Sequence, residues 1–256
     1  MPNWNPSHYL AYAEERTRAA IDLAVRVKLD APKIIVDLGC GPGNSTQVLH
    51  QRWSTSEILG IDNSSEMIAT ARKSYPNQSW QLANVSTWSP TQPVDLAYSN
   101  AVLQWIPDHR SLINRLFANV AHSGALAFQI PSSTYSTVRT LIHEISRMPE
   151  WTEQMEAPRN VLTMMDPSFY YDILVSDASN LDIWETEYNH VMESCDAIVD
   201  WIASTGLRPF LAALNSEEQR NRFVNMLNQR VRESYKPRVD GKVLFPFRRT
   251  FVIAYR

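Results

Sequence analysis

The 256-residue sequence has few of the residues that mark several classes of protein. Its two cysteines, Cys40 and Cys195, lie far apart in the chain and lack the spacing of metal ligands, so we predict no metal site. It contains no run of about eighteen apolar residues and no signal-peptide pattern. Internal repeats and low-complexity tracts are also missing. We therefore expect a soluble, cytoplasmic protein with no membrane partner.

An excess of charge of either sign is missing as well. Lys and Arg number 24 and Asp and Glu number 27, which gives a net charge of −3. This balance argues against a general nucleic-acid surface, although it leaves room for a local basic pocket. The length suits one α/β domain with a modest insertion and is ample to bury a core. We expect residues 1–256 to form a single domain and a monomer.

Glycine is scarce, at 7 residues, yet Gly39, Gly41 and Gly43 stand at every second position of one short stretch. The apolar run 34–36 enters this stretch, and a helical pattern that begins with Val48 and Leu49 follows it. The layout predicts a strand, a tight turn and a helix N-terminus. Such glycines let the backbone turn sharply and bring a ligand against main-chain N–H groups. A purely structural glycine turn is the alternative.

The spacing of the glycines discriminates between ligands. A dinucleotide fingerprint needs glycine at the first, third and sixth positions of its run, and here Asn44 stands at the sixth. That departure argues against an NAD-dependent oxidoreductase. With Asp37 at the end of the strand, the run Asp-x-Gly-x-Gly-x-Gly resembles the first motif of the class I S-adenosylmethionine (SAM) methyltransferases.

The second predicted strand, 58–62, ends in Asp62, which lies 23 residues beyond Gly39. A carboxylate about twenty residues after the glycine turn accepts hydrogen bonds from ribose hydroxyls in folds of this kind. We expect Asn63 to cap the next helix, with Glu66 as its capping-box partner. Met67 on the inner face of that helix would lie against an adenine ring or pack in the core.

The third predicted strand, 79–83, is followed by Asn84 and Val85, and the fourth, 94–100, ends at Asn100. Ligands of open α/β sheets lie beyond the carboxyl ends of the strands, where the strand order reverses. Strands one and four flank that point. We therefore expect Asn100, Gln104 and Trp105 to face the reaction centre, with core packing as the alternative for Trp105.

The remaining pattern alternates helices and strands, with prolines breaking a helical insertion. In the helix 14–27, Ile21, Ala24 and Val25 are expected to face inward. We predict a helical cap insertion at about 134–175 and further cap helices at about 196–236. Within the latter, a capping box of Ser216 and Gln219 opens a helix that runs to about Tyr235. The other expected elements are a helix at 112–121, strands at 125–130, 181–188 and 250–255, a helix at 197–204 ended by Gly206, and a loop at 243–249.

Several segments together resemble the trans-aconitate 2-methyltransferase family over nearly the whole chain. They are Trp4-Asn5-Pro6-x-x-Tyr9-Leu10, the glycine motif 37–46, Asn100-Ala101-x-Leu103-Gln104-Trp105-x-Pro107-Asp108-His109, 170–174, 182–184 and Ala203-x-Thr205-Gly206-Leu207-Arg208-Pro209. The resemblance implies a doubly wound, mostly parallel seven-stranded sheet with the last strand antiparallel. It also implies methyl transfer from SAM to a carboxylate of trans-aconitate, which gives a monomethyl ester and S-adenosylhomocysteine.

The resemblance also implies where the cofactor is held. The expected cofactor-binding residues are Asp37, Gly39, Gly41, Gly43, Asp62, Asn63, Met67, Asn84, Val85 and Asn100. One of them departs from the family, because Asn84 stands where these enzymes tend to have an Asp that holds the adenine amino group. The amide carbonyl of Asn84 is still able to accept from that amine.

The chemistry of the implied reaction asks for alignment more than for acid–base groups. A carboxylate is already ionised at pH 7, so no base is needed, and we predict no catalytic residue. A polycarboxylate needs fixed cations, for which the planar fork of Arg is best suited. The expected substrate-binding residues are His8, Tyr9, Gln104, Trp105, Arg159, Arg208 and Arg248. Of the neighbours Arg248 and Arg249, one is expected to point outward.

Two alternatives remain within this chemistry. The chain could methylate another acid, such as an acyl-carrier-bound malonyl group, for which an exposed basic patch would be expected. It could also bind SAM without catalysis, because the glycine motif and Asp62 indicate that SAM binds and do not indicate that it reacts.

Overall fold

The computed structural model describes residues 13–132 and 136–256 of the chain, and the side chains from residue 17 onward. These residues fall into two compact units. One unit comprises residues 136–162 and 187–248, and the other comprises residues 13–132, 163–186 and 249–256. We describe each unit by itself, and call the first the helical unit and the second the sheet unit. The interpretation of the whole chain as a single domain stays a prediction.

A seven-stranded sheet has the order β3-β2-β1-β4-β5-β7-β6. Strands β1 to β5 belong to the sheet unit, whereas β6 and β7 each have residues in both units. Strands β1 to β5 run parallel, whereas β7 runs antiparallel to β5. The fold class expected from the sequence is thereby confirmed. The strands are β1 Ile34–Leu38, β2 Glu57–Asp62, β3 Ser79–Leu82, β4 Val94–Asn100, β5 Val120–Pro131, β6 Asn180–Met192 and β7 Val243–Tyr255.

The strand order reverses between β1 and β4. The chain moves outward from β1 to β2 and β3, then returns to place β4 on the other side of β1. Parallel strands present their carboxyl ends at one edge of a sheet, and ligands of such sheets lie beyond that edge at the point of reversal. The ends of β1, β2 and β4 are therefore the place to look for a site.

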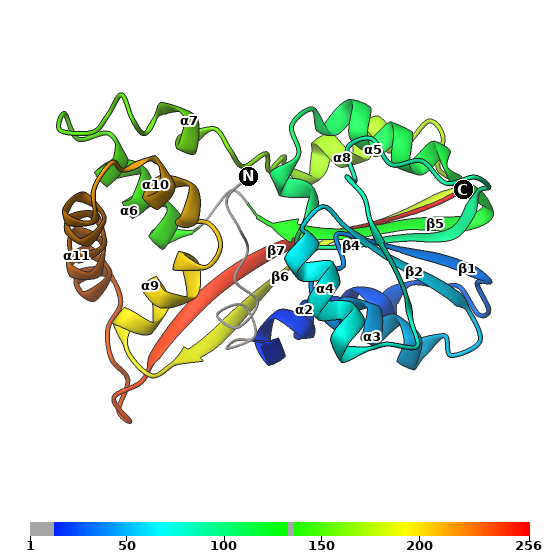
Figure 1. Ribbon diagram of the computed structural model, residues 1–256, viewed down its shortest axis with the longest axis horizontal. Coiled ribbons are helices and arrows are strands. Elements are labelled where there is room, and N and C mark those ends of the chain that lie inside the picture. Colours follow the sequence, from blue (N-terminus) through cyan, green and yellow to red (C-terminus); the bar gives the residue numbers. More distant parts are fainter. Residues whose placement is uncertain (1–12, 133–135) are drawn as a thin grey trace. The chain divides into compact units, whose positions relative to one another are not determined.

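Helices cover both faces of this part of the sheet (Figure 1). Helices α2 (Ala13–Arg26), α3 (Asn44–Arg52) and α4 (Ser65–Ser74) lie on one side. Helices α5 (His109–Ala118) and α8 (Pro167–Leu174) lie on the other, where their apolar side chains join the inward residues of β1, β4 and β5 in one buried cluster. Both faces of the strands are buried, which is why the strands are nearly continuous apolar runs.

The helical unit contains α6 (Thr137–Ser146), α7 (Glu156–Arg159), α9 (Cys195–Ala203), α10 (Arg208–Ala213) and α11 (Glu217–Ser234). Its core is rich in aromatic rings. Trp201 lies 4.6 Å from the ring of His190 and packs edge-on against Phe245, while Phe223 of α11 packs against Trp151. Helices α9 and α11 bury the apolar residues Ile198, Trp201, Ile202, Phe223, Leu227 and Val231.

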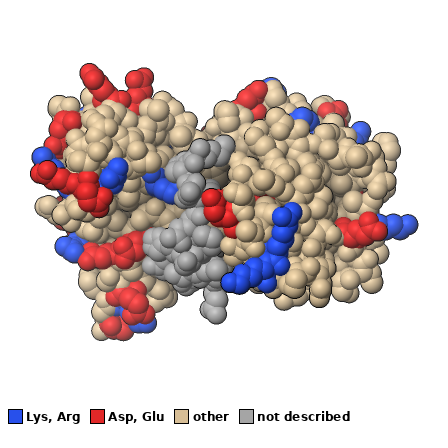
Figure 2. Space-filling view, in the orientation of Figure 1, with Lys and Arg blue, Asp and Glu red and all other residues tan. Residues whose placement is uncertain are grey.

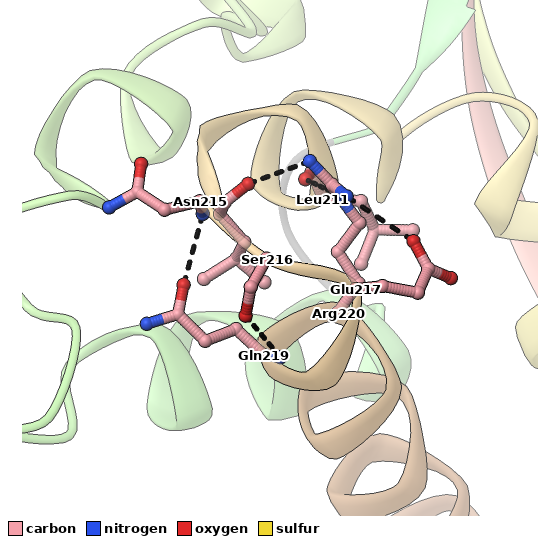
Figure 3. A network of polar contacts seen from close by, with 7 residues as sticks. Leu211, Asn215, Ser216, Glu217, Gln219 and Arg220 are labelled. Atoms are coloured by element: carbon pink, nitrogen blue, oxygen red, sulfur yellow. Dashed lines mark hydrogen bonds and ion pairs between the residues drawn. The ribbon is translucent and has the colours of Figure 1, made fainter.

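Helix α11 begins with the predicted capping box. The Ser216 hydroxyl accepts from the N–H of Gln219 at 3.2 Å, and the Gln219 amide oxygen accepts from the N–H of Asn215 at 3.0 Å. Figure 3 shows these contacts beside Arg220, which donates to the carbonyl of Leu211 at the end of α10. The first turn of α11 is thus tied both to its own cap and to the preceding helix.

Two expected helix details are wrong. In α2, Ile21 and Val25 are exposed, because the stripe centred on Ala20 and Leu23 packs inward instead. Small residues let the sheet approach closely there, and the Tyr98 hydroxyl donates to the carbonyl of Ala20 at 2.6 Å. The cap of α4 is Ser64, not Asn63, because the Asp62 carboxylate accepts from the Ser64 N–H and delays the helix by one residue.

Other element boundaries also differ from the sequence-based expectation. Helix α5 ends at Ala118, and β5 already begins at Val120, with an irregular register before Ala125 where Ser123 has φ 66°. Strand β7 includes the stretch expected to be a loop, because Phe245 is buried among the aromatic rings. Helix α10, with Pro209 in its first turn, was not predicted.

Several charges on the described surface occur as opposite pairs. Ion pairs join Arg232 to Asp196, Lys242 to Glu193 and Arg26 to Asp182, with N···O distances of 2.6, 2.7 and 2.7 Å. On the face drawn in Figure 2, basic and acidic side chains are intermixed. Among the residues described here, no helix combines the length and the apolar character that crossing a bilayer requires.

The cap of α11 gives a stability prediction. Ser216→Ala should lower the free energy of unfolding by about 1 kcal/mol, because the N–H of Gln219 loses its acceptor. Ser234→Ala, at the exposed far end of the same helix, is the matched control and should change it by less than about 0.5 kcal/mol. Urea unfolding followed by circular dichroism measures both. Equal shifts for the two variants would contradict the capping role.

Candidate active site

The turn after β1 is bound to the end of β2 by its own N–H groups. The N–H groups of Gly39 and Cys40 both donate to the carbonyl of Ile61, at 2.8 and 2.9 Å, and the Gly41 N–H donates to the Asp62 carboxylate at 3.0 Å. The expectation that the N–H groups of this turn face a ligand is therefore wrong for these three residues. The turn is instead held flat against the neighbouring strand.

The three glycines of this turn share a backbone conformation that favours glycine, and Gly39 and Gly41 differ in the space around them. All have positive φ: 76° at Gly39, 56° at Gly41 and 102° at Gly43. A Cβ on Gly39 would lie 2.4 Å from the side chain of Val102, so glycine there allows the segment after β4 to approach. A Cβ on Gly41 would meet nothing within 4 Å. Gly41 therefore borders open space, which is where a ligand has room.

Asp37 lies beneath this turn and is fully buried. One carboxylate oxygen accepts from the hydroxyls of Ser45 and Thr46, at 2.6 and 2.7 Å, which fixes the start of α3 to the end of β1. The other oxygen is buried without a hydrogen-bond partner in the structure. Burial raises the pKa of Asp37 to about 6, against the opposing effect of the two hydroxyls. A direct contact between Asp37 and a cofactor stays a prediction.

Asp62 ends β2 beside the same turn. Its two oxygens accept from the N–H groups of Gly41 and Ser64, at 3.0 and 2.8 Å. Burial raises the pKa of its carboxyl, while hydrogen bonds from the backbone act in the opposite direction. A carboxylate has about four acceptor positions, so further lone pairs are available to the ribose hydroxyls expected here.

The expected adenine contacts receive mixed support. The Asn84 amide oxygen already accepts from both the N–H and the hydroxyl of Ser86, at 3.0 and 2.8 Å, which occupies the group proposed to hold the adenine amine. The side chains of Val85 and Met67 are buried, so Val85 can reach a ligand only through its backbone. Asn63 is exposed. These four assignments stay predictions.

The segment after β4 packs directly on the glycine turn. The Ser99 hydroxyl donates to the carbonyl of Leu38 at 2.9 Å, and Asn100 follows it, half-buried. Gln104 is buried, with its amide nitrogen donating to the carbonyl of Ala101 at 2.7 Å. Trp105 is half-buried. The structure thus brings Asn100, Gln104 and Trp105 to the edge where the turn and Asp62 lie.

The buried pair His109 and Tyr170 contacts the backbone of this segment. In the short 3-10 helix η1 (Leu103–Trp105), the carbonyl of Leu103 lies 3.0 Å from Nε2 of His109, and Nδ1 of His109 lies 2.6 Å from the Tyr170 hydroxyl. Carbonyl oxygens only accept, so Nε2 carries the proton and Nδ1 accepts from Tyr170. Burial lowers the pKa of His109, which keeps the ring neutral.

Gln129 of the sheet unit was missed as a site candidate, and it lies beside Arg249. Arg249 of β7 is buried and donates to the amide oxygen of Gln129 at 3.2 Å, and the Gln129 amide nitrogen donates to Asn100 Oδ1 at 2.6 Å. The available signal was Gln129 itself, a lone amide in the apolar run 125–130. The expectation that one of Arg248 and Arg249 points outward is confirmed, because Arg249 is buried and Arg248 is half-buried.

The arginines expected to bind substrate belong to the helical unit. Arg159 donates to the carbonyls of Ser146 and Thr152, at 2.7 and 3.1 Å, and Arg248 lies 3.4 Å from Glu187. Arg208 begins α10, and burial lowers the pKa of its guanidinium. His8 and Tyr9 lie outside the described residues. The substrate contacts of all these residues stay predictions.

The residues of the sheet unit fit the SAM cofactor that the resemblance implies. The open space at Gly41, the lone pairs of Asp62 and the unpartnered oxygen of Asp37 all lie at the β1–β2 end. SAM carries ribose hydroxyls, an ammonium and a sulfonium, which are donors and cations that match these acceptors. The carboxylates therefore suit SAM better than a dinucleotide with its anionic pyrophosphate.

Comparisons with known proteins agree with this geometry. A family model described as a methyltransferase domain matches residues 9–186. Trans-aconitate 2-methyltransferase of Azoarcus sp. (strain BH72) is 41% identical over 256 residues, which cover 100% of both chains. The enzyme of the same name from Escherichia coli O45:K1 is 42% identical, and the match covers 100% of this chain and 99% of the relative.

Solved structures share the fold at low sequence identity. The YcgJ protein of Bacillus subtilis has a TM-score of 0.60 at 13% identity, covering 93% of this chain and 99% of that one. Phosphoethanolamine N-methyltransferase 2 of Haemonchus contortus, in complex with S-adenosylhomocysteine, has a TM-score of 0.57 at 12% identity. It covers 93% of this chain and 52% of that one. These likenesses support the methyltransferase fold.

The buried carboxyl of Asp37 predicts a particular pH dependence of stability. Its pKa of about 6 in the folded protein exceeds the ordinary value of 3.8, so between these values the folded state holds a proton that the unfolded state releases. Stability from this group is therefore full below about pH 4 and is lost as the pH rises through about 6.

Asp37→Asn should remove this loss. Relative to the variant, the wild-type free energy of unfolding should fall by up to about 3 kcal/mol between about pH 4 and about pH 7. Urea unfolding at several pH values measures the difference, and the variant itself controls for every other titrating group. Parallel stability curves for the two proteins would contradict the shifted pKa.

Proposed function

We propose that this chain, which belongs to the trans-aconitate 2-methyltransferase family, transfers the methyl group of SAM to a carboxylate of trans-aconitate. The products would be a monomethyl ester and S-adenosylhomocysteine. The observation that carries this proposal is full-length identity of about 40% to enzymes of that name, combined with a glycine turn and acidic strand ends that fit SAM. A monomeric, cytoplasmic enzyme stays a prediction.

Bound SAM would supply an electrophilic methyl group on its sulfonium: the C–O bond to the carboxylate would form as the C–S bond breaks, and S-adenosylhomocysteine would leave as the neutral thioether. The acceptor is ionised at pH 7, so the chain needs no general base for it. The residues at the ends of β1, β2 and β4 instead bind and orient. Alignment of two bound reactants supplies about 7–11 kcal/mol of a barrier, which is the main contribution we assign to this protein.

The glycine turn holds the cofactor through its shape in this proposal. Gly41 borders open space, and its N–H positions Asp62, whose remaining lone pairs receive the ribose hydroxyls. Asp37, at the end of β1, would contribute a negative charge that suits the ammonium and sulfonium of the cofactor. Asn100, at the end of β4, lies where the strand order reverses and offers an amide to the same ligands.

The carboxylates of the substrate require cations. We assign this role first to Arg208, because it begins α10 within the Thr-Gly-Leu-Arg-Pro segment that resembles the family, and its planar fork matches a carboxylate. Arg159 is the weaker candidate, because two carbonyls already receive its donors, and Arg248 has Glu187 beside it. Gln104 and Trp105 remain assigned to the substrate, as the sequence suggested.

The direct test is release of S-adenosylhomocysteine from SAM with trans-aconitate, cis-aconitate, citrate and isopropylmalate. We expect turnover with trans-aconitate to exceed that with each other acid. Equal turnover across the panel would reject trans-aconitate as the specific substrate. Binding of SAM with no turnover at all would favour another acid, such as an acyl-carrier-bound malonyl group, or a non-catalytic SAM-binding module. Binding of NAD in place of SAM would favour an oxidoreductase.

Gly41 and Gly39 offer a paired test of the cofactor site. Gly41→Ala should cost about 1–2 kcal/mol of stability because of its positive φ, yet stay folded, since its Cβ has room. We expect it to weaken SAM binding at least tenfold, because the methyl group enters the ligand space. Gly39→Ala should instead destabilise the fold more strongly, because Val102 must move. Calorimetry and thermal unfolding separate the two, and unchanged SAM affinity in Gly41→Ala would refute the placement.

Arg208 gives the substrate test. Arg208→Ala should raise the KM for the acid about tenfold or more while the Kd for SAM is unchanged, since a charged hydrogen bond contributes about 1.5–3 kcal/mol. Arg222→Ala is the matched control, because Arg222 is exposed and pairs with Glu150 at 2.8 Å. A KM that rises equally in both variants, or in neither, would remove Arg208 from the site.

A further inference from the structure

Three polar side chains form a buried line across the sheet unit, from β7 through β5 to β4. A guanidinium nitrogen of Arg249 lies 3.2 Å from the amide oxygen of Gln129, and the amide nitrogen of Gln129 lies 2.6 Å from Asn100 Oδ1. Gln129 is 0% exposed and Arg249 is 4% exposed, so bulk water does not substitute for either partner. Asn100 and Gln129 face each other directly in the β4–β5 register.

The donors and acceptors of these groups allow only one orientation of the Gln129 and Asn100 amides. A guanidinium has donors and no acceptor, so the atom of Gln129 that faces Arg249 must be the amide oxygen. The amide nitrogen of Gln129 then faces Asn100, which must present its own oxygen. The NH2 group of Asn100 is left on the opposite side of its amide. A positive charge in β7 thereby decides the orientation of a side chain at the end of β4.

Asn100 belongs to the segment that lies against the glycine turn, at the edge of the sheet where a ligand is expected. Ser99 donates to the carbonyl of Leu38, and Val102 fills the space that a Cβ on Gly39 would take, so residues 99–102 lie against the glycine turn. Asn100 is half-buried, and no acceptor for its NH2 group is recorded among residues 13–132 and 136–256. Its two donors are therefore available at the point where the strand order reverses.

We propose that Arg249 and Gln129 are positioning residues that hold Asn100 with its NH2 group toward the ligand, where it donates to a carboxylate. The proposal rests on the proposed function for the identity of the ligands. Two ligands of that reaction carry carboxylates, namely the amino-acid end of SAM and the acid to be methylated. The same contact serves either, and the experiment distinguishes them.

The test is Gln129→Glu, which keeps the size of the side chain and reverses the polarity of the line. The introduced carboxylate would accept both from Arg249 and from the NH2 group of Asn100, and the Asn100 amide would turn its oxygen toward the ligand. A carboxylate ligand would then meet an acceptor. We expect its affinity to fall about tenfold to a hundredfold, as loss of a charged hydrogen bond implies. Gln129→Met, which removes the line without reversing it, should cause a smaller loss.

Calorimetry with S-adenosylhomocysteine and with trans-aconitate, beside the acid's KM, assigns the contact. A weaker Kd for S-adenosylhomocysteine alone assigns it to the amino-acid carboxylate, and a weaker Kd and higher KM for the acid alone assign it to the substrate. If neither affinity changes in Gln129→Glu, the proposal is overturned. Where wild-type protein binds no acid, the proposed function fails, and the proposal is then decided on the affinity for S-adenosylhomocysteine.

A double-variant cycle separates positioning from general structural support. Asn100→Asp should reproduce the loss seen in Gln129→Glu, because it also presents oxygen to the ligand. In an Asn100→Ala background, Gln129→Glu should add less than about a twofold further loss. Additive losses would show that Gln129 acts by another route and would overturn the proposal. If Gln129→Glu does not fold, Arg249→Lys and Arg249→Met replace it. Lys has donors only and should retain affinity, whereas Met has no donor and should lose it, and equal affinities overturn the proposal.

Discussion

The attachment of the glycine turn to the end of β2 is the constraint on which the candidate site depends. Three consecutive N–H groups, those of Gly39, Cys40 and Gly41, donate to Ile61 and Asp62, so the turn cannot lift away from the sheet without losing three hydrogen bonds, one of them from the buried Cys40. Unsatisfied buried donors cost about 1–3 kcal/mol each. The turn is therefore rigid, and the position of Asp62 is coupled to it.

Two buried charges lie on either side of this turn within the sheet unit. Asp37 is beneath it and accepts from Ser45 and Thr46, while Arg249 is reached through Asn100 and Gln129. Buried charges destabilise a fold unless they are paired or hydrogen-bonded. Neither is required by the sheet itself, since apolar residues would fill both places. Each charged group instead fixes the orientation of its hydrogen-bond partners, because a carboxylate only accepts and a guanidinium only donates.

Orientation is also what the proposed reaction needs. A carboxylate nucleophile requires no base, and the site accordingly presents amides, hydroxyls and backbone groups at the strand ends. Burial lowers the pKa of His109, and the bonds of its ring to Tyr170 and Leu103 place it against the segment from Leu103 to Trp105. Its role is to hold that segment in place. The chain thus uses His109 for structure, assigns carboxylates and arginines to ligand binding, and leaves the reaction to alignment.

The sequence by itself determined the glycine turn, the first four strands, the capping box of α11 and the family, because each depends on local spacing that short-range sterics and hydrogen bonds enforce. It did not determine which face of α2 is buried, that the turn's N–H groups bind β2, or that β7 begins at Val243. Only the tertiary structure decided these, and only it joined Arg249, Gln129 and Asn100, which are up to 149 residues apart in the chain. The pairing of distant strands places them together, and periodicity along one segment carries no record of its partner.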